Sequence, residues 1–226
     1  MGLGYTYGLM VANTSTTTEH FVPPPESVLS GRSRLVRFTR EDAMVMLNAG
    51  VIPEDATTEL LNGMIVLKDR SSLDEDPTMI GKGHRICVEK LSNLRSQINS
   101  PSRHVGSQQP IVCSDTHVPE PDFMVVRGTL EEYSDLPLAA DAFCVIEVAD
   151  SSYERDAGEK LVGYARAGVM QYIIINLRNR TAEVYGGPDA VAGTYPPPQI
   201  VAESQALSIR VAEGESCSTT LRDLLP

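Results

Sequence analysis

The chain has 226 residues, 42% of them hydrophobic and 22% charged, so it can bury one large core or two small ones. Its 30 acidic residues outnumber the 19 basic ones, giving a formal net charge of −11. This balance argues against a protein that coats DNA or an anionic membrane, although one local basic groove is compatible with it.

Hydropathy and cysteine usage point to a cytoplasmic protein. No stretch approaches the ~18 consecutive apolar residues that a membrane span requires, so we expect no membrane partner. The four cysteines are widely spaced and form no CxxC pair, which is typical of a reducing compartment and not of a zinc site.

Residues 1–34 are rich in Thr and Ser and include the triple proline Pro23–Pro25, which favours an extended backbone. We therefore expect a flexible N-terminal arm, followed by a single domain over residues 35–226. In that domain, Thr39 with Asp42 three residues later predicts the start of a helix, and Gly50 its end. Farther along, Asn62-Gly63 between two apolar runs predicts a β-hairpin.

The middle of the chain predicts a helix followed by strands. Within residues 83–100 an apolar stripe with helical spacing comprises His84, Cys87, Leu91, Leu94 and Ile98. A strand pair is expected around residues 104–115. The two strongest strands are residues 121–126 and 142–150, with a turn or short helix between them.

The last third of the chain alternates helix and strand again. Residues 151–168 predict a helix that ends at Gly168. Strands are expected over residues 169–177, 181–187 and 206–211, before a short helix at the C-terminus. This mixed order predicts an α/β or α+β fold, with a central sheet flanked by helices.

Two carboxylates interrupt the strongest strands. Asp122 heads one apolar run and Glu147 lies inside the other, and neighbouring strands would bring them together. Two close carboxylates cannot both stay ionised without a counter-charge. Mg²⁺ or Mn²⁺ would supply that charge and prefers oxygen ligands. The alternative is structural: Asp122 caps a turn and Glu147 pairs with an arginine.

Lys160 lies on the predicted helix after Glu147, with Asp156 four residues before it and Tyr164 four after. The three share one helical face, which we expect to differ from the packing face that carries Leu161 and Ala165. Lys160 would then point at the carboxylate pair. The alternative is an exposed Asp156–Lys160 ion pair, worth only ~0.3–0.5 kcal/mol.

These segments together resemble a known family. "PEPDFMVV", "FCVIEVADSS" and "ERDAGEKLVGYARAGVMQYIIIN" follow one another in the order found in the Uma family of restriction endonucleases, part of the PD-(D/E)XK nuclease superfamily. "TELLNGMIVL" and "GHRICVEKL" resemble the upstream segments of that family. The resemblance covers roughly residues 36–226 and implies a restriction-endonuclease-like fold with a central mixed sheet.

The resemblance implies roles for particular residues. Asp122 with Pro121 corresponds to the "PD" of the motif and Glu147 to its second acid. The lysine position of the motif falls on Ala149, so the basic group would come from Lys160 on the following helix.

The remaining implied roles concern the metal and its surroundings. Asp122, Glu147 and the carbonyl of Val148 would hold Mg²⁺ or Mn²⁺, with Glu59 as an additional ligand. His84 would be an accessory catalytic residue, while Asp156 and Tyr164 would support Lys160. Taken alone, His84 also fits a partly buried side chain without a catalytic role.

The function implied is metal-dependent hydrolysis of phosphodiester bonds in DNA by a homodimer without an organic cofactor. Lys82 and Arg85 lie beside His84 and are candidates for the basic groove. Two alternatives stay open: a catalytically inactive nuclease fold that serves as a dimeric binding or scaffold module, and a hydrolase acting on another phosphate ester.

Overall fold

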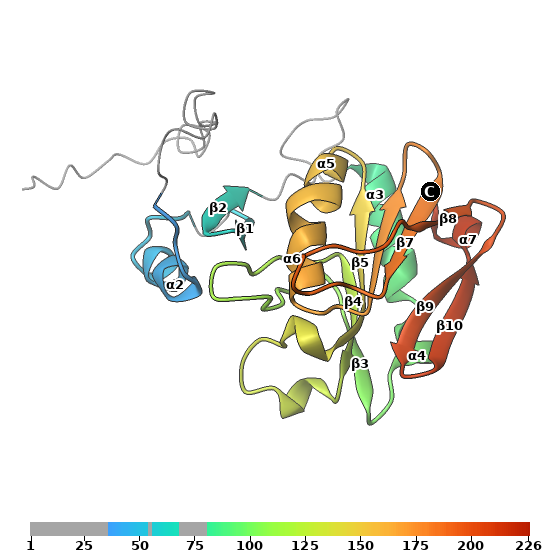
Figure 1. The fold of residues 1–226 in the computed structure, drawn as a ribbon, viewed down its shortest axis with the longest axis horizontal. Helices are drawn as coiled ribbons and strands as arrows, with labels where there is room; N and C mark the ends of the chain where they lie inside the picture. Colours follow the sequence, from blue (N-terminus) through green and yellow to red (C-terminus); the bar gives the residue numbers. More distant parts are fainter. Residues whose placement is uncertain (1–35, 54–55, 68–80) are drawn as a thin grey trace, which may run out of the picture. The chain divides into compact units, whose positions relative to one another are not determined.

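A six-stranded mixed sheet is the central element of the structure, a computed structural model (Figure 1). Residues 36–53, 56–67 and 81–226 are described, all within the unit Val36–Pro226. The predicted N-terminal arm, residues 1–34, lies outside the described residues and stays a prediction.

The strand order in the sheet is β3-β4-β5-β6-β7-β8, and all neighbours are antiparallel except β5 and β6. The strands are β3 (Arg103–Gly106), β4 (Phe123–Arg127), β5 (Ala142–Ala149), β6 (Gln171–Asn176), β7 (Thr181–Gly186) and β8 (Gln199–Ala202). Parallel strands need a long crossover. Here it consists of α5 (Tyr153–Arg155), the π-helical turn η4 (Asp156–Lys160) and α6 (Leu161–Arg166).

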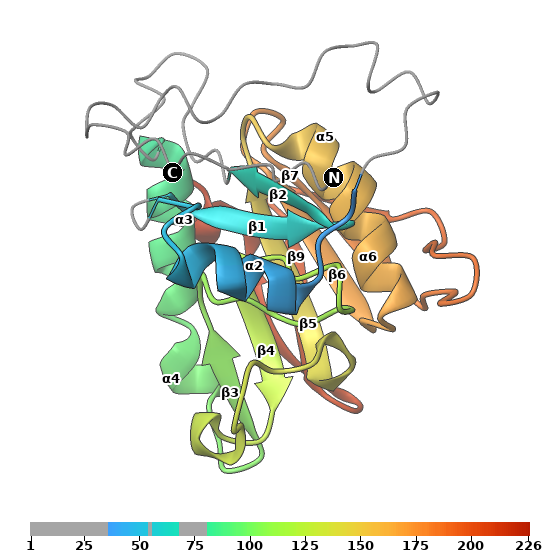
Figure 2. The same ribbon diagram turned by 90° about the vertical axis from the view of Figure 1, so that its left-hand side faces the viewer.

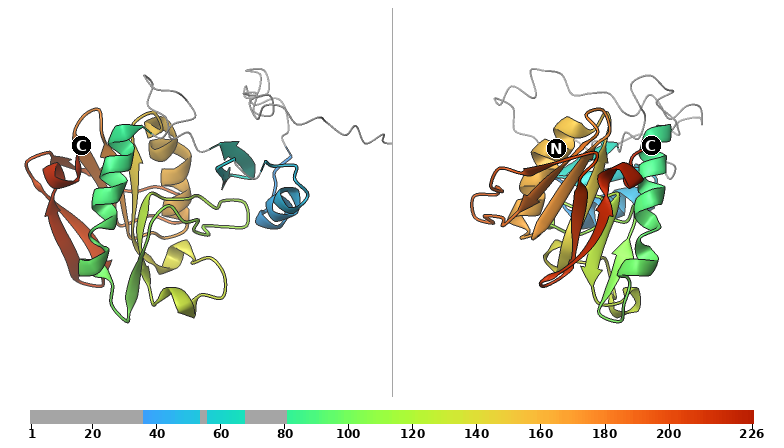
Figure 3. Two further views of the ribbon diagram at one scale, coloured as in Figure 1. Left: turned by 180° about the vertical axis from the view of Figure 1, so that it is seen from behind. Right: turned by 90° about the vertical axis from the view of Figure 1, so that its right-hand side faces the viewer.

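Helices cover both faces of this sheet, so the predicted fold class is confirmed (Figures 1 and 3). The crossover helices pack on one face. The other face carries α3 (Lys82–Ser92), α4 (Arg95–Ile98), α7 (Leu221–Leu224) and the hairpin of β9 (Ala206–Ala212) and β10 (Glu215–Thr220). Short 3-10 turns, η2 (Leu130–Glu132) and η3 (Ala139–Asp141), lie between β4 and β5.

The alternation of side chains along β5 explains the two cores. Ile146 and Val148 belong to the core under α3, whereas Val145 and Ala149 belong to the core under α6. Successive side chains of a strand point to opposite faces. Glu147 therefore faces the crossover helices from inside an otherwise apolar strand, every residue of which is buried.

The N-terminal helix and hairpin form as predicted. Thr39 and Asp42 make a reciprocal capping box at the start of α2 (Arg40–Asn48). The hairpin of β1 (Thr58–Leu61) and β2 (Met64–Leu67) turns at Asn62 and Gly63, which have φ values of 52° and 77°. The hairpin is a two-stranded sheet of its own, apart from the six-stranded sheet in Figure 1, and Figure 2 shows α2 running alongside β1.

The hairpin is joined to the segment that precedes β4. Leu60 forms an antiparallel bridge with Val118, and the Gly63 N–H donates to the Thr116 carbonyl at 2.6 Å. This link brings Glu59 of β1 close to the start of β4, although 63 residues separate Glu59 from Asp122.

Three local predictions were wrong. The single helix over residues 83–100 is two helices, because Ser92 and Asn93 end α3; the stripe is nevertheless buried at all five positions. Of the strand pair predicted around residues 104–115, the first strand forms as β3 and the second does not form. Pro110, which lies in that second half, has no N–H to donate to a neighbouring strand. Strands β8 and β10 were missed because their sequences, "QIVA" and "ESCSTT", are short or polar.

No helix within the described ranges is both long and apolar enough to cross a membrane.

Candidate active site

Asp122 lies one residue before β4 and is 2% exposed. Its Oδ2 accepts a hydrogen bond from the Val148 backbone N–H at 2.9 Å and lies 2.9 Å from His84 Nε2. Phe123, the first residue of β4, pairs with Ile146, the neighbour of Glu147 near the end of β5. Because the two strands are antiparallel, this register places Asp122 and Glu147 at the same edge of the sheet. The contacts of Asp122 with His84 and with Val148 both come from distant parts of the sequence.

His84 is brought to this site from the first turn of α3. It is buried, and a carboxylate can only accept, so its Nε2 donates the hydrogen bond to Asp122. Among the described residues its Nδ1 makes no hydrogen bond. The ring of His84 therefore contacts the carboxylate of Asp122 directly, and its catalytic role stays a prediction.

Lys160 is the centre of a buried charge cluster. Its Nζ lies 2.8 Å from Glu59 Oε1, 3.0 Å from Glu147 Oε1 and 3.7 Å from Asp156 Oδ1. Burial lowers the pKa of Lys160, but the three carboxylates more than offset this and raise its pKa above the ordinary value. Lys160 therefore stays charged.

This burial decides one alternative. Asp156, Lys160 and Tyr164 are all at most 1% exposed, so the exposed Asp156–Lys160 ion pair is wrong. The expectation that their face differs from the packing face of Leu161 and Ala165 is also wrong, because all three are buried, as Ala165 is, whereas Leu161 is only partly buried. Desolvation raises the pKa of Asp156, and the charge of Lys160 partly offsets it.

Two hydrogen-bond donors from the crossover bind the same carboxylate oxygen of Glu147. The Tyr164 hydroxyl donates to Oε1 at 2.9 Å, and Lys160 Nζ donates to the same atom at 3.0 Å. Burial, and then the charge of Glu147, raise the pKa of Tyr164 well above its ordinary value, so the phenol keeps its proton. Ala149, two residues on in β5, has no exposed surface and lies on the same face as Glu147.

Glu59 completes the cluster from the hairpin. Its Oε1 accepts the Glu120 backbone N–H at 2.7 Å as well as contacting Lys160. The same carboxylate thus ties β1 to the segment before Asp122 and to the crossover. All the sequence-predicted side chains are buried: Glu59, His84, Asp122, Glu147, Asp156, Lys160 and Tyr164. Lys160 contacts Glu59, Glu147 and Asp156, and Tyr164 contacts Glu147. His84 and Asp122 contact each other, and Asp122 is bound to β5 through the Val148 N–H.

Sequence reasoning assigned nothing to His117, which lies against this cluster. Its Nδ1 accepts the Asn62 N–H at 3.3 Å, and its Nε2 lies against the backbone of Gly163, where an added Cβ would come within 2.2 Å. Burial, and then the charge of Lys160, lower the pKa of His117 to about 4. Only its position five residues before Asp122 could have drawn attention to it.

The donor chemistry of the site fits a hard divalent cation. Glu59, Asp122 and Glu147 offer carboxylate oxygens. Lys160 is the one buried ammonium in the part of the chain that the structure describes, so these three carboxylates outnumber it without Asp156 being counted. Within the described residues, however, no three His, Cys, Asp or Glu side chains form a group arranged to hold a metal. Glu59 and Glu147 instead direct an oxygen at Lys160. The predicted metal ligands, Val148 among them, stay a prediction.

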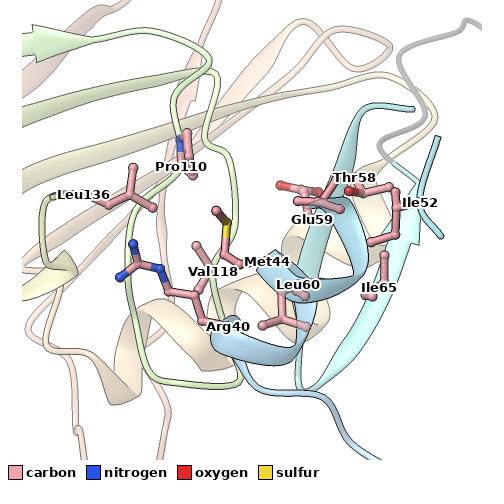
Figure 4. A pocket seen from close by; sticks show the side chains of 12 residues that line it. Arg40, Met44, Ile52, Thr58, Glu59, Leu60, Ile65, Pro110, Val118 and Leu136 are labelled. Atoms are coloured by element: carbon pink, nitrogen blue, oxygen red, sulfur yellow. The ribbon is translucent and has the colours of Figure 1, made fainter. Parts of the chain in front are cut away.

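A small apolar cavity of about 160 Å³ lies beside Glu59 (Figure 4). It is lined by Arg40, Ala43, Met44, Leu47, Ile52, Thr58, Glu59, Leu60, Ile65, Pro110, Val118 and Leu136. Glu59 thus borders both this cavity and the charge cluster, whereas Asp122, Glu147 and Lys160 do not line the cavity.

The comparison with known families now assigns the chain. The Uma2 family model, described as "Putative restriction endonuclease", matches residues 54–220, well over half of the chain. The chain belongs to the Uma2 family. This membership confirms the resemblance read from the motifs, and the matched range of the Uma2 domain includes every predicted site residue.

One solved structure shows the same fold as this Uma2 chain. It is a crystal structure of a protein described as "a putative nuclease belonging to DUF820" from Anabaena variabilis ATCC 29413, with a TM-score of 0.59 and 14% sequence identity. The similarity covers 83% of this chain and 97% of that chain. No curated protein matches the Uma2 chain.

Proposed function

We propose that the chain is a metal-dependent endonuclease that hydrolyses phosphodiester bonds in DNA in the cytoplasm. Membership of the Uma2 family supports a nuclease. The strongest support is the contact between Lys160 Nζ and Glu147 Oε1 at 3.0 Å. Ala149 occupies the lysine position of the motif, and this contact places a lysine beside the second acid all the same.

In this proposal Asp122, Glu147, the Val148 carbonyl and Glu59 hold Mg²⁺ or Mn²⁺. A bound divalent cation supplies a Lewis acid that neutralises charge developing on the phosphate. His84 and the Val148 N–H orient Asp122 through its Oδ2. That leaves Asp122 preorganised before any ligand binds.

Lys160 places a permanent positive charge where negative charge builds during the reaction. Its raised pKa excludes it as a general base, so it stabilises charge and orients water or a phosphate oxygen. Tyr164 keeps its proton and fixes Glu147, and Asp156 holds Lys160 from its own helix.

The DNA substrate is supported by the residues around His84. Lys82 and Arg85 are exposed on the first turn of α3, on either side of that buried histidine. Basic side chains beside the carboxylates would contact phosphates next to the scissile one.

A cleavage assay on supercoiled DNA with Mg²⁺ or Mn²⁺ tests this proposal. Asp122→Asn and Lys160→Met should each lower kcat by roughly a hundredfold or more, the effect of losing one electrostatic stabiliser at a reacting phosphate. Asp135→Asn, a carboxamide substitution at an exposed aspartate paired with Arg40, should leave cleavage unchanged. Equal cleavage by wild type and Asp122→Asn would reveal a contaminating nuclease and refute the proposal.

The main competing function is a catalytically inactive dimeric scaffold. It predicts correct folding and no metal-stimulated cleavage of DNA, RNA or simple phosphodiesters by the wild type. Cleavage of a small phosphate ester without cleavage of DNA would instead favour the third candidate, a hydrolase of another substrate class.

The proposed homodimer has support from one surface. Among the described residues, five of the eleven exposed large hydrophobic side chains fall within residues 36–51, on and around α2: Val36, Met44, Val45, Leu47 and Val51. Such clustering is typical of association surfaces. Light scattering during gel filtration should give twice the chain mass, and Val45→Glu should reduce it to one chain; a wild-type monomer would contradict the homodimer.

A further inference from the structure

The crossover helix that carries Lys160 is irregular at the residues that matter most. Asp156, Lys160 and Tyr164 are spaced by four residues, and all three side chains point into the buried charge cluster. In a regular α-helix each residue turns by about 100°, so the eighth residue along lies about 80° around the axis from the first. A regular helix would therefore place Asp156 and Tyr164 at opposite edges of one helical face, with Lys160 between them.

The π-helical turn η4 removes this drift. It spans Asp156–Lys160 between two α-helical segments. A π turn closes its hydrogen bond over five residues instead of four, so it is wider and rotates less per residue. The rotation lost in η4 offsets the rotation gained between Lys160 and Tyr164. All three side chains can then face Glu147.

A hydroxyl from the sheet holds the start of η4. Tyr172 of β6 has no exposed surface, and its hydroxyl donates to the backbone carbonyl of Asp156 at 3.0 Å. Its ring lies 4.8 Å from the ring of Tyr164, centroid to centroid. Burial raises the pKa of Tyr172 well above its ordinary value, so this donor keeps its proton.

A second contact holds the side chain of the same residue. The Ser152 hydroxyl donates to Asp156 Oδ2 at 2.5 Å, while Asp156 Oδ1 lies 3.7 Å from Lys160 Nζ. The backbone of Asp156 is thus fixed from β6 and its carboxylate from the loop after β5. π turns are rare and persist where their surroundings hold them.

We propose that η4 sets the direction of Lys160, and that Tyr172 is a positioning residue acting through the Asp156 carbonyl. This inference deepens the proposed function. Only the cleavage measurement in its test depends on that function; the measurement of Lys160 modification does not. Tyr172 touches neither substrate nor metal in this proposal; it keeps the ammonium in contact with Glu59 and Glu147.

Comparison of Tyr172→Phe with Tyr195→Phe tests it. Tyr195 is a matched control, because its hydroxyl also donates to a backbone carbonyl, that of Val169 at 2.7 Å, and its ring belongs to the same aromatic cluster. Each variant loses one such hydrogen bond and keeps its ring. The readout is the rate at which an amine-specific reagent modifies Lys160 in the folded protein, followed by mass spectrometry.

We expect Tyr172→Phe to raise the modification rate of Lys160 about tenfold and Tyr195→Phe to leave it unchanged. The thiol of Cys87, which has no exposed surface and lies in the other core, reports global unfolding when a thiol reagent is used in parallel. An increase at Lys160 that is matched at Cys87, or equalled in Tyr195→Phe, would overturn the inference.

Two further measurements complete the test. In the cleavage assay, Tyr172→Phe should lower kcat with little change in KM. If the wild type does not cleave, the proposed function fails while the labelling comparison still decides the inference. Should Tyr172→Phe not fold, Ser152→Ala removes the other hydrogen bond to Asp156 at a less buried position, and an unchanged Lys160 labelling rate there would overturn the inference.

Discussion

At the scale of single residues, the burial of Lys160 is the feature that most needs a physical account. Removing an ammonium from water costs several kcal/mol, and only close, well-placed carboxylates offset that cost. Glu59 and Glu147 do so within 3.0 Å of Nζ. Each of these residues would be destabilising without the others.

Lys160→Met should lower the free energy of unfolding by about 3–5 kcal/mol, because it leaves buried carboxylates without their cation. The loss should shrink on acidification, as those carboxylates become protonated. Urea unfolding at pH 7 and pH 5 measures both effects. Lys82→Met at an exposed position should leave stability unchanged. A small loss at pH 7 that does not depend on pH would contradict the buried cluster.

His117 makes stability sensitive to mild acid. The pKa of His117 falls from its ordinary value of 6.5 to about 4 in the folded protein, mainly through burial. Between these two values the unfolded chain binds more protons than the folded chain, so the free energy of unfolding decreases as the pH falls from about 6.5 to about 4.

His117→Asn should flatten this dependence, removing up to roughly 3 kcal/mol of pH-dependent destabilisation between pH 6.5 and pH 4. Chemical denaturation across that range, for wild type and variant, measures the difference. Parallel curves for the two proteins would show that His117 does not titrate as inferred.

At the scale of secondary-structure elements, glycine decides how closely α6 approaches the hairpin turn. His117 lies between Gly163 of α6 and the Asn62 N–H of the turn, and only a residue without Cβ leaves room for its ring. This close approach sets the spacing between the crossover, in which Lys160 ends η4 just before α6, and the hairpin, in which Glu59 lies on β1.

Gly163→Ala should destabilise the protein by about 1–3 kcal/mol, because overpacking against the ring outweighs the gain of up to ~1 kcal/mol in helix propensity. Gly158→Ala in η4 is the matched control; no atom lies within 4 Å of its added Cβ, so it should be neutral or stabilising. The double variant Gly163→Ala/His117→Ala should lose less than the sum of the single variants. Additive losses would argue against the contact.

At the scale of the whole molecule, a chain with a net charge of −11 places several of its carboxylates at one buried site. The chain as a whole repels DNA, so binding would depend on the few basic side chains near α3 and on a cation at the site. The contribution of the basic side chains and that of the cation should both weaken as the salt concentration rises. The contribution of the cation should also be lost when Asp122 is replaced.

Mg²⁺ should therefore stabilise the folded chain. At a hundredfold excess over Kd the gain is about 2.7 kcal/mol, seen as a higher Tm with MgCl2 than with EDTA and KCl at equal ionic strength. Asp122→Asn should abolish the gain, whereas Asp135→Asn should keep it. An equal gain in Asp122→Asn would show that the cation acts elsewhere.

The sequence alone determined the elements and most of the residues of the site. Continuous apolar runs located β4 and β5, the Asn62-Gly63 turn located the hairpin, and charges beside or inside these runs singled out Asp122 and Glu147. These signals are local, so they can be read along the chain. The role of Lys160 required the family resemblance as well, because helical spacing fits an exposed ion pair equally well.

Only the tertiary structure decided which helical face is buried, and that His117 lies against Gly163 and Tyr172 against Asp156. Helical spacing alone fits an exposed Asp156–Lys160 ion pair as well as a buried Lys160, and no local signal marks the π-helical turn η4. The contact of Lys160 with Glu59 depends on packing between segments about a hundred residues apart in the chain. Such long-range contacts leave no periodicity in either segment, so they become visible only once the chain is folded.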